Sequence, residues 1–189
     1  MGGVKNNAAN VSTGKPAVGG AFFRAPLKTK LPTTAKEEIN EAFKNLGYIS
    51  DDGLGNTNER DVGEIKAWGG DVVGKPQKSK KDEFELTFIE IKNPEVCKLV
   101  FGDTNVIGTD IKTGITINVN AKELPHGSYV VDMIMSEGDL KRAVIPDGQV
   151  IKVAEVNYKD DDAIGYKVTI AAYPDATGNT HYEYMQSQD

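Results

Sequence analysis

Large apolar side chains alternate with polar ones in the stretch Phe84-Glu85-Leu86-Thr87-Phe88. Because successive side chains of a strand point to opposite faces, this period of two is typical of a half-buried β-strand. Ile89 and Ile91 then change parity, which predicts a bulge or burial on both faces at this point. The stretch therefore predicts a sheet that covers a core with one of its faces.

The same alternation recurs later in the chain, in residues 115–119 and 129–135. Further apolar runs lie near residue 144 and in residues 151–158 and 164–173. The turn signals between runs are Glu137-Gly138-Asp139, Pro146-Asp147-Gly148 and Asp160-Asp161-Asp162. We predict four antiparallel strands here, joined by short turns, and a first strand in residues 17–25 that ends at Pro26. The predicted fold class is mainly β, an antiparallel β-sandwich or barrel.

Two short helices are predicted beside these strands. Thr34-Ala35-Lys36-Glu37 fits a capping box, and the apolar residues up to Leu46 fall on one helical face before Gly47. Asn93-Pro94 fits an N-cap followed by proline at the first helical position, and Gly102 closes this second helix. The apolar faces consist of Ile39, Ala42, Phe43 and Leu46 in the first helix and Val96, Leu99 and Val100 in the second.

Size and composition favour one globular domain. The 189 residues fall within the range of about 50–250 residues for single domains. The N-terminus lacks a secretion signal, so we expect the protein to stay in the cytoplasm where it is made. The most apolar window, residues 129–135, is far shorter than the roughly 20 residues that span a bilayer. Cys97 is the only cysteine, which excludes an intrachain disulfide.

Charge is distributed unevenly along the chain. The net charge is −6, yet residues 1–36 contain six basic residues and no acidic one, which leaves a balance of −12 for the remainder. This basic leader could dock on the acidic body of a neighbouring copy, or it could be a solvated, frayed terminus. We predict an arm in residues 1–16, a single β domain in residues 17–174 and a C-terminal arm in residues 175–189.

No catalytic or cofactor motif stands out. Cys97, His126 and His181 are the residues from which a Cys/His nucleophile pair would have to come. However, Cys97 falls on the predicted core face of the second helix, where thiols are commonly inert. Three scattered ligands do not make a zinc site, and Gly14-Lys15 lacks the rest of a phosphate-binding loop. We expect no enzyme activity, no metal and no cofactor.

Two acidic stretches and one basic cluster are best interpreted as loops. Asp51–Asn56 and Asp160–Asp162 both fail the ligand spacing of a calcium-binding EF-hand, so we predict hairpin loops there. The basic cluster lacks interleaved aromatics in an acidic protein, so a solvated loop or one that docks on an acidic neighbour is favoured over a nucleic-acid site. Its members are Lys75, Lys78, Lys80 and Lys81.

In order and spacing, several blocks resemble the opening half of the major tail tube protein of phages with long, non-contractile tails, especially those that infect actinobacteria. The resemblance covers residues 17–106 and its blocks lie in residues 21–27, 31–33, 46–53, 65–71, 84–90, 93–96 and 98–103. It implies a structural virion protein that forms hexameric rings, stacked around a tape measure protein into a hollow tail tube. DNA would pass through without specific binding. Tail tip and tail terminator proteins would lie at the two ends of the tube.

The resemblance also implies extended hairpins and terminal arms that join subunits. We expect residues 70–81 to form a long hairpin tip that contacts the next ring, and Trp68 to anchor either the core or a subunit contact. The alternatives are another β-sandwich tail component, a sheath-less injection tube component or a carbohydrate-binding module, although no exposed aromatic platform is evident. The candidate inter-subunit contacts are Lys5, Lys15, Phe22, Phe23, Arg24, Trp68, Lys75, Lys78, Lys80, Lys81, Tyr182 and Tyr184.

Overall fold

A computed structural model describes residues 5–188, so residues 1–4 of the expected N-terminal arm and residue 189 of the C-terminal arm lie outside the described residues. The main element is a nine-stranded sheet with the order β3-β2-β10-β11-β12-β7-β4, in which every pair is antiparallel. β1 continues the β2 side along β10, and β13 continues the β12 side along β11. The mainly β fold class is confirmed, and the sheet is consistent with the predicted sandwich. The strands are β1 Lys15–Pro16, β2 Phe22–Pro26, β3 Lys44–Asn45, β4 Ile49–Val62, β7 Gln77–Phe88, β10 Gly127–Ile134, β11 Leu140–Val153, β12 Tyr166–Tyr173 and β13 Tyr182–Gln186.

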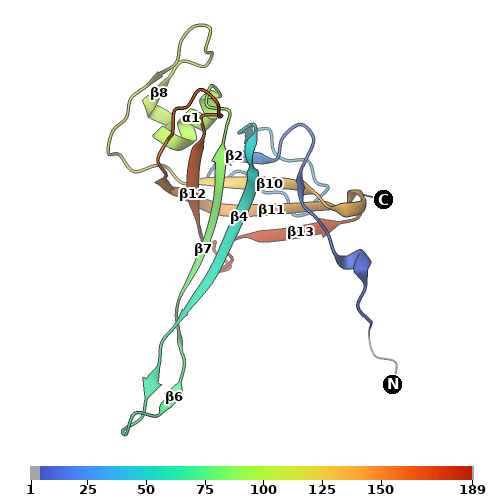
Figure 1. Ribbon diagram of the computed structural model, residues 1–189, viewed down its shortest axis with the longest axis vertical. Coiled ribbons are helices and arrows are strands. Elements are labelled where there is room, and N and C mark those ends of the chain that lie inside the picture. Colours follow the sequence, from blue (N-terminus) through green and yellow to red (C-terminus); the bar gives the residue numbers. More distant parts are fainter. Residues whose placement is uncertain (1–4, 189) are drawn as a thin grey trace.

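Figure 1 shows how this sheet folds across itself. β10, β11 and β13 run across the body, while β4 and β7 cross them and continue far beyond it as one long hairpin. Two short strands, β5 Ile65–Lys66 and β6 Val72–Gly74, pair near the end of this hairpin. A second small ribbon, β8 Val106–Ile107 with β9 Thr116–Ile117, lies at the opposite end of the molecule. The molecule therefore consists of a packed body with a thin projection.

The body has a core in which the alternating strand predicted from sequence takes part. Phe84, Leu86 and Phe88 of β7 are at most 3% exposed, so this prediction is confirmed. They pack with apolar residues of β10, β11 and β12 and with the helix α1 Pro94–Phe101. The predicted cap of α1 is also confirmed, because the Glu95 amide donates to the Asn93 side chain at 3.0 Å. The buried helix residues are Val96, Cys97, Leu99 and Val100.

The other predicted helix, residues 34–46, does not form. These residues are a loop with a short strand, β3, and they cover the second face of the sheet at Val130 and Val144. Arg142 in β11 donates from Nη1 to the carbonyls of Thr34 at 3.0 Å and Glu37 at 2.6 Å. Helix hydrogen bonds would have needed those two carbonyls for amides four residues later. The prediction was wrong because a buried guanidinium occupies these acceptors, although the apolar side chains are still used in the core.

Two other local predictions were also wrong. Residues 115–119 do not form a full strand: only β9 is paired, and Val119 is 77% exposed, because this segment lies against one short partner and not against the core. Pro146-Asp147-Gly148 is not a turn but the middle of β11. Along one side, β11 changes partner here, from β13 up to Val144 to β12 from Asp147. Pro146, which has no amide donor, stands at that change.

The turn at Glu137 and the loop at residues 160–162 are confirmed, but the acidic stretch Asp51–Asn56 is not a loop. It belongs to β4, where the pairing with β7 is irregular between Ile49 and Leu54. The closing turn of the hairpin is also earlier than expected, at residues 67–71, because Gly69 and Gly70 have φ values of 109° and 100° that suit a tight reversal. Among residues 5–188, no helix has the length and apolar character to cross a membrane.

Candidate assembly surfaces

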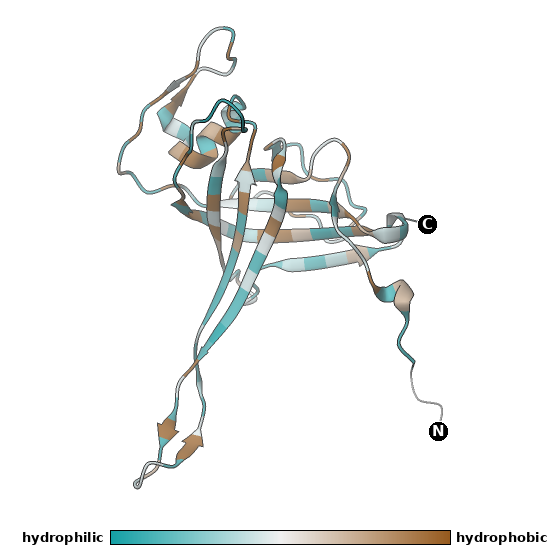
Figure 2. Cartoon of the chain, in the orientation of Figure 1, coloured by the Kyte–Doolittle hydropathy of each residue, from teal (hydrophilic) through white to brown (hydrophobic). Residues whose placement is uncertain are grey.

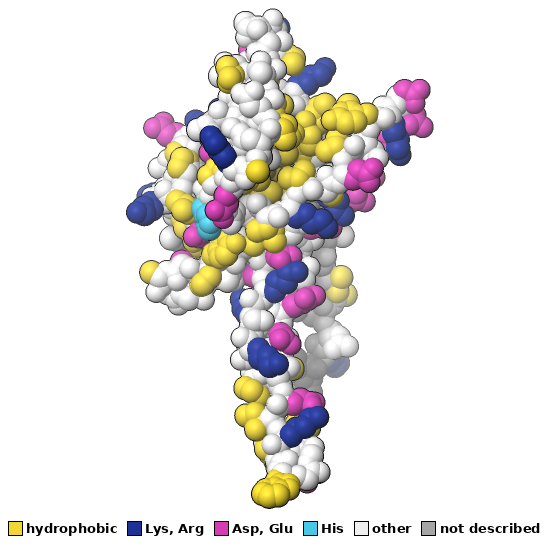
Figure 3. Space-filling view, turned by 90° about the vertical axis from the view of Figure 1, so that its left-hand side faces the viewer, with side chains coloured by type: hydrophobic (Ala, Val, Ile, Leu, Met, Phe, Trp, Pro, Cys, Tyr) yellow, Lys and Arg dark blue, Asp and Glu magenta, His cyan; other side chains and the backbone are white. Residues whose placement is uncertain are grey.

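The stem of the long hairpin is a two-stranded ribbon without a core of its own. From Asp82 onward β7 packs on the body, whereas residues 77–81 and their partners in β4, residues 59–62, are exposed. Oppositely charged Glu59 and Lys81 face each other across the strands. Figure 3 shows basic and acidic side chains following one another along the stem. Since isolated two-stranded hairpins are marginally stable in water, this ribbon is suited to stabilisation by a neighbour. Three of the predicted basic contacts lie here: Lys78, Lys80 and Lys81.

The tip of the hairpin is apolar, in contrast to the stem that carries it. Figure 2 shows the hydrophobic β5 and β6 beyond a hydrophilic stem. Trp68 is 106% exposed, so it is not a core anchor, and that half of its prediction was wrong. Lys75 is exposed beside β6. Exposed apolar clusters commonly mark interaction sites. The other exposed apolar residues of the tip are Val62 at 55%, Ile65 at 54%, Val72 at 45% and Val73 at 64%.

A buried carboxylate, Asp82, fixes the base of the hairpin to the segment before β13. Asp82 accepts hydrogen bonds from the Thr180 hydroxyl and from the Asn56 side chain, and His181 Nδ1 lies 2.6 Å from its Oδ2. Burial acts to raise the pKa of this carboxyl, but the hydrogen bonds from these partners outweigh it and hold the pKa of Asp82 below its ordinary value. The base of the hairpin is therefore held to the body by polar contacts as well as by the pairing of β7 with β12. Sequence reasoning missed this cluster because 99 residues separate Asp82 from His181.

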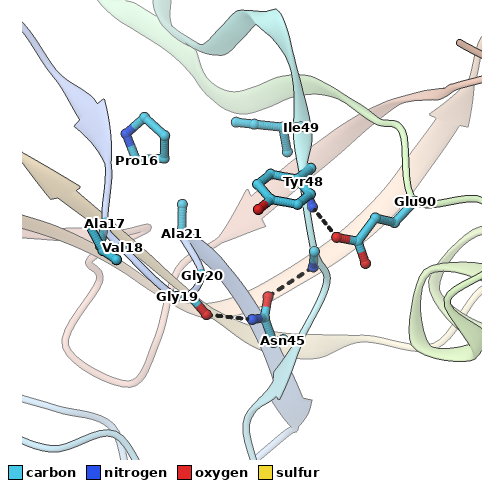
Figure 4. A pocket seen from close by; sticks show the side chains of 11 residues that line it. Pro16, Ala17, Val18, Gly19, Gly20, Ala21, Asn45, Tyr48, Ile49 and Glu90 are labelled. Atoms are coloured by element: carbon cyan, nitrogen blue, oxygen red, sulfur yellow. Dashed lines mark hydrogen bonds between the residues drawn. The ribbon is translucent and has the colours of Figure 1, made fainter.

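An apolar pocket lies at the other end of the hairpin, beside the first residue of β4 (Figure 4). Asn45 spans its wall, donating from Nδ2 to the Gly19 carbonyl at 2.9 Å and accepting from the Gly47 amide at 2.8 Å. The Tyr48 amide donates to Glu90 Oε1 at 3.0 Å. Gly47 has a φ of 74°, and a Cβ there would lie 2.1 Å from the Glu90 carboxylate, so the turn requires glycine. The pocket has a volume of about 500 Å³ and was not predicted from the sequence.

Of the N-terminal residues predicted to contact other subunits, some lie on the surface and others in the interior. Lys5 and Lys15 are exposed, and Lys15 lies in β1, paired with β10. Phe22, in contrast, is 0% exposed and packs edge-on against Phe88 in the core, with ring centroids 5.5 Å apart. Phe23 is half-buried against the second face of the sheet. Arg24 forms a bidentate pair with Asp103 at 2.8 and 3.1 Å. Phe22 and Arg24 therefore make contacts within this chain.

The two C-terminal tyrosines predicted to contact other subunits help to cover the second face of the sheet. Tyr182 and Tyr184 lie in β13 and stack with ring centroids 6.3 Å apart and planes at 3°. Both are half-buried against Val144 and its neighbours. The Tyr182 hydroxyl donates to Asp175 at 2.6 Å, and this bond lowers the pKa of the Asp175 carboxyl. β13 is thus paired with β11, and its two tyrosines are packed on the body of this chain.

The sequence matches a known protein family over almost its whole length. A model of the family described as Phage tail tube protein matches residues 6–189. The chain belongs to the phage tail tube protein family. It is accordingly a structural component of the phage tail, where it assembles into the tail tube with other tail proteins. The resemblance to a major tail tube protein is confirmed, while its restriction to phages of actinobacteria stays a prediction. No individual curated protein matches the sequence.

The residues considered for catalysis in this tail tube protein have other partners. The Cys97 thiol donates to the Ile91 carbonyl at 3.3 Å, and burial raises the pKa of this thiol, which disfavours the reactive thiolate. His126 Nδ1 lies 2.5 Å from Asp147 Oδ1, and His181 is bonded to Asp82. Within residues 5–188, no group of three His, Cys, Asp or Glu side chains could hold a metal ion. The surfaces that remain to be explained are those of the hairpin and the pocket.

Proposed function

We propose that copies of this chain close into hexameric rings and that the rings stack into the hollow tail tube through which DNA is ejected into the host. Membership of the tail tube family supports this role. The observation that carries it is the β4–β7 hairpin, whose stem leaves the body with both faces exposed. Such a stem has little to stabilise it in a lone molecule, whereas neighbouring copies would cover it.

Open strand edges supply a route for closing a ring. Within residues 5–188, the outer edge of β4 has no further strand partner. On the far side of the sheet the edge is formed by two-residue strands, β1 and β3. Such edges promote aggregation in a monomer, but closure around a ring satisfies them. The ring of six copies is taken from the family resemblance.

Charge suits the passage of DNA. The chain outside residues 1–36 has a balance of −12, so a wall built from it repels phosphates and prevents tight binding that would stop ejection. The repulsion acts within about 10 Å at moderate salt, which is enough for a wall close to the duplex. The basic residues 5–36 would dock on the acidic body of a neighbouring copy, with Lys5 and Lys15 as contacts.

The remaining assignments follow from a purely structural role. The partners would be the chain itself, the tape measure protein, and the tail tip and tail terminator proteins. The protein would be made in the host cytoplasm and end in the virion tail, without membrane contact, cofactor or catalysis. Residues 17–174 would form the single tail tube domain, with residues 1–16 and 175–189 as arms. The hairpin would contact the next ring through Trp68 and the lysines at positions 75, 78, 80 and 81.

Negative-stain electron microscopy of the purified protein at rising concentration tests this function. We expect rings or striated cylinders, formed either spontaneously or after addition of the tail tip complex and the tape measure protein. Persistent single particles under all of these conditions would overturn the proposal. Tubes of a different symmetry would overturn the hexamer while leaving the tube intact.

A further inference from the structure

We propose that the Trp68 tip of one copy inserts into the apolar pocket beside Tyr48 of a second copy, in the next ring. This inference rests on the proposed function and names the two surfaces through which rings would stack. The tip comprises residues 62–73, and the pocket is lined by residues 16–21, 45, 47–49 and 90.

The two surfaces lie at opposite ends of one hairpin. β4 begins at Ile49, which lines the pocket and pairs with Phe88, and it ends at Val62, which pairs with Gln77 near the tip. A strand of 14 residues spans about 45 Å at about 3.3 Å per residue. Figure 1 shows the hairpin projecting away from the body, so the tip does not reach the pocket of its own chain. Only a second copy can bring the two together.

The geometry of such a contact fits an open stack. A contact between two different surfaces is head-to-tail, and it repeats indefinitely when the surfaces point in opposite directions. Here one copy presents its tip at one end and its pocket at the other end of the β4–β7 pair. Each added ring therefore leaves an unused pocket or tip for the next one.

The chemistry of the two surfaces also matches. Trp68 is fully exposed on an apolar tip, and the rim of the pocket exposes Val18 at 94% and Tyr48 at 76%. Glu90, the one charged residue in the lining, is already bonded to the Tyr48 amide and, at 3.3 Å, to Asn93 Nδ2. A buried tryptophan in a preformed pocket is the usual anchor of a protein interface. Pockets that hold compact groups measure about 300–1,000 Å³, a range that includes this one.

Charges at the margins of the two surfaces are complementary. Asp71 follows Trp68 along the tip, where Glu64 is already paired with Lys66 at 3.7 Å. At the pocket, Lys15 precedes Pro16 and Lys44 precedes Asn45. Asp71 and these two lysines are exposed. Opposite charges around an apolar contact favour its orientation and exclude the reversed approach. One acidic group on the tip and two basic groups at the pocket rim therefore accompany the apolar contact.

Cysteine cross-linking under assembly conditions tests the contact directly. Ala67→Cys, beside Trp68, and Val18→Cys, on the pocket rim, place thiols at exposed positions without removing either surface. The native Cys97 is only 1% exposed, so the parent protein shows how much cross-linking occurs without the introduced cysteines. The double variant, mildly oxidised, is expected to give a ladder of covalently linked chains on a non-reducing gel, and each single variant only monomer. The matched control pairs Val18→Cys with Lys112→Cys, an exposed position in the loop between β8 and β9, and is expected to give no ladder.

The outcomes separate this inference from the proposed function. Tubes in the microscope without a ladder would overturn the docking contact and leave tube assembly standing, whereas absence of tubes in the parent protein would overturn both. Dimers of Ala67→Cys alone would show tip-to-tip contact and also overturn the inference. In an independent test, Trp68→Glu should raise the protein concentration needed for tubes at least tenfold, and Trp68→Phe far less. Equal behaviour of these two variants would contradict the anchor role of Trp68.

Discussion

The two halves of β7 belong to one strand but differ in burial. Residues 82–88 alternate between the core and the outer face, while residues 77–81 are exposed on both faces and carry three lysines. Pairing with β4 stays in register across the boundary between the two halves, from Leu54 opposite Leu86 to Asp61 opposite Ser79. The comparison shows that a strand can be continuous in its pairing and yet change from a part of the core to a part of an assembly surface.

This difference predicts which substitutions affect the single molecule and which affect the tube. Side chains of the body contribute free energy of unfolding, because they are removed from water within the chain. Side chains of the stem and the tip contribute little in the monomer and act only when a neighbour covers them. Four substitutions, taken in order of their expected effect on the free energy of unfolding, test whether the boundary between body and hairpin lies at Asp82.

Phe88→Ala should have the largest effect on monomer stability. The ring is 0% exposed and contacts Phe22 edge-on, so its removal leaves a cavity in the centre of the core. We expect a loss of about 3–5 kcal/mol in the free energy of unfolding. Urea unfolding of the unassembled protein measures it. A loss below about 1 kcal/mol would show that this half of β7 is not the core strand described here.

Arg142→Met should lower the free energy of unfolding by about 3 kcal/mol, since it leaves the Asp132 carboxylate and two loop carbonyls without their donor. Amide exchange should become faster in residues 34–43, which the guanidinium holds. Lys141→Met is the matched control. Lys141 pairs with Glu183 at 3.1 Å, and because both side chains remain partly in contact with water the loss of this pair should cost less than about 1 kcal/mol. Equal losses for the two variants would contradict the role given to Arg142.

Asp82→Asn should cost about 1–3 kcal/mol at neutral pH, because it weakens the cluster that holds the base of the hairpin. The folded-state pKa of Asp82 is lowered, so its stabilisation is complete above the unfolded pKa of about 3.9 and is lost as pH falls through the folded value. The stability difference between parent and variant should therefore shrink in acid. Urea unfolding at neutral pH and at about pH 3 measures this, and a constant difference would contradict the assignment.

Trp68→Ala should change the free energy of unfolding least, by no more than about 0.5 kcal/mol, since the side chain is fully exposed in the monomer. Its effect should be on assembly. A thermal or urea unfolding curve that shifts as far as that of Phe88→Ala would place Trp68 in a core and remove the contrast between body and hairpin.

Sequence patterns predicted the elements whose determinants are local. The strand at Phe84–Phe88 and the capped helix after Asn93 are specified by residues that lie within a few positions of one another. The helix predicted for residues 34–46 failed because its carbonyls are bonded by Arg142, 105 and 108 positions away. The turn predicted at residue 146 was wrong because β11 continues through this point, where its neighbour changes from β13 to β12. Both neighbours come later in the sequence, so the local pattern does not contain this information.

The candidate surfaces were predictable only in part, for the same reason. The lysines and Trp68 were recognised as candidates from the sequence, but the apolar tip became visible only when β5 and β6 brought its residues together. The pocket combines side chains from three separate segments of the chain, and the Asp82 cluster combines residues almost 100 positions apart. Neither leaves a periodic pattern in the sequence.

Shortening the hairpin tests the central claim most directly. Gly63 and Pro76 face each other through a backbone hydrogen bond of 2.8 Å, so residues 64–75 can be replaced by Asn-Gly, a two-residue hairpin turn. Parent and shortened protein are compared by negative-stain electron microscopy at equal concentration, with their unfolding curves as the control for folding. We expect tubes from the parent, and from the shortened protein an unchanged unfolding curve without tubes. Tubes of normal length and striation from the shortened protein would contradict the account.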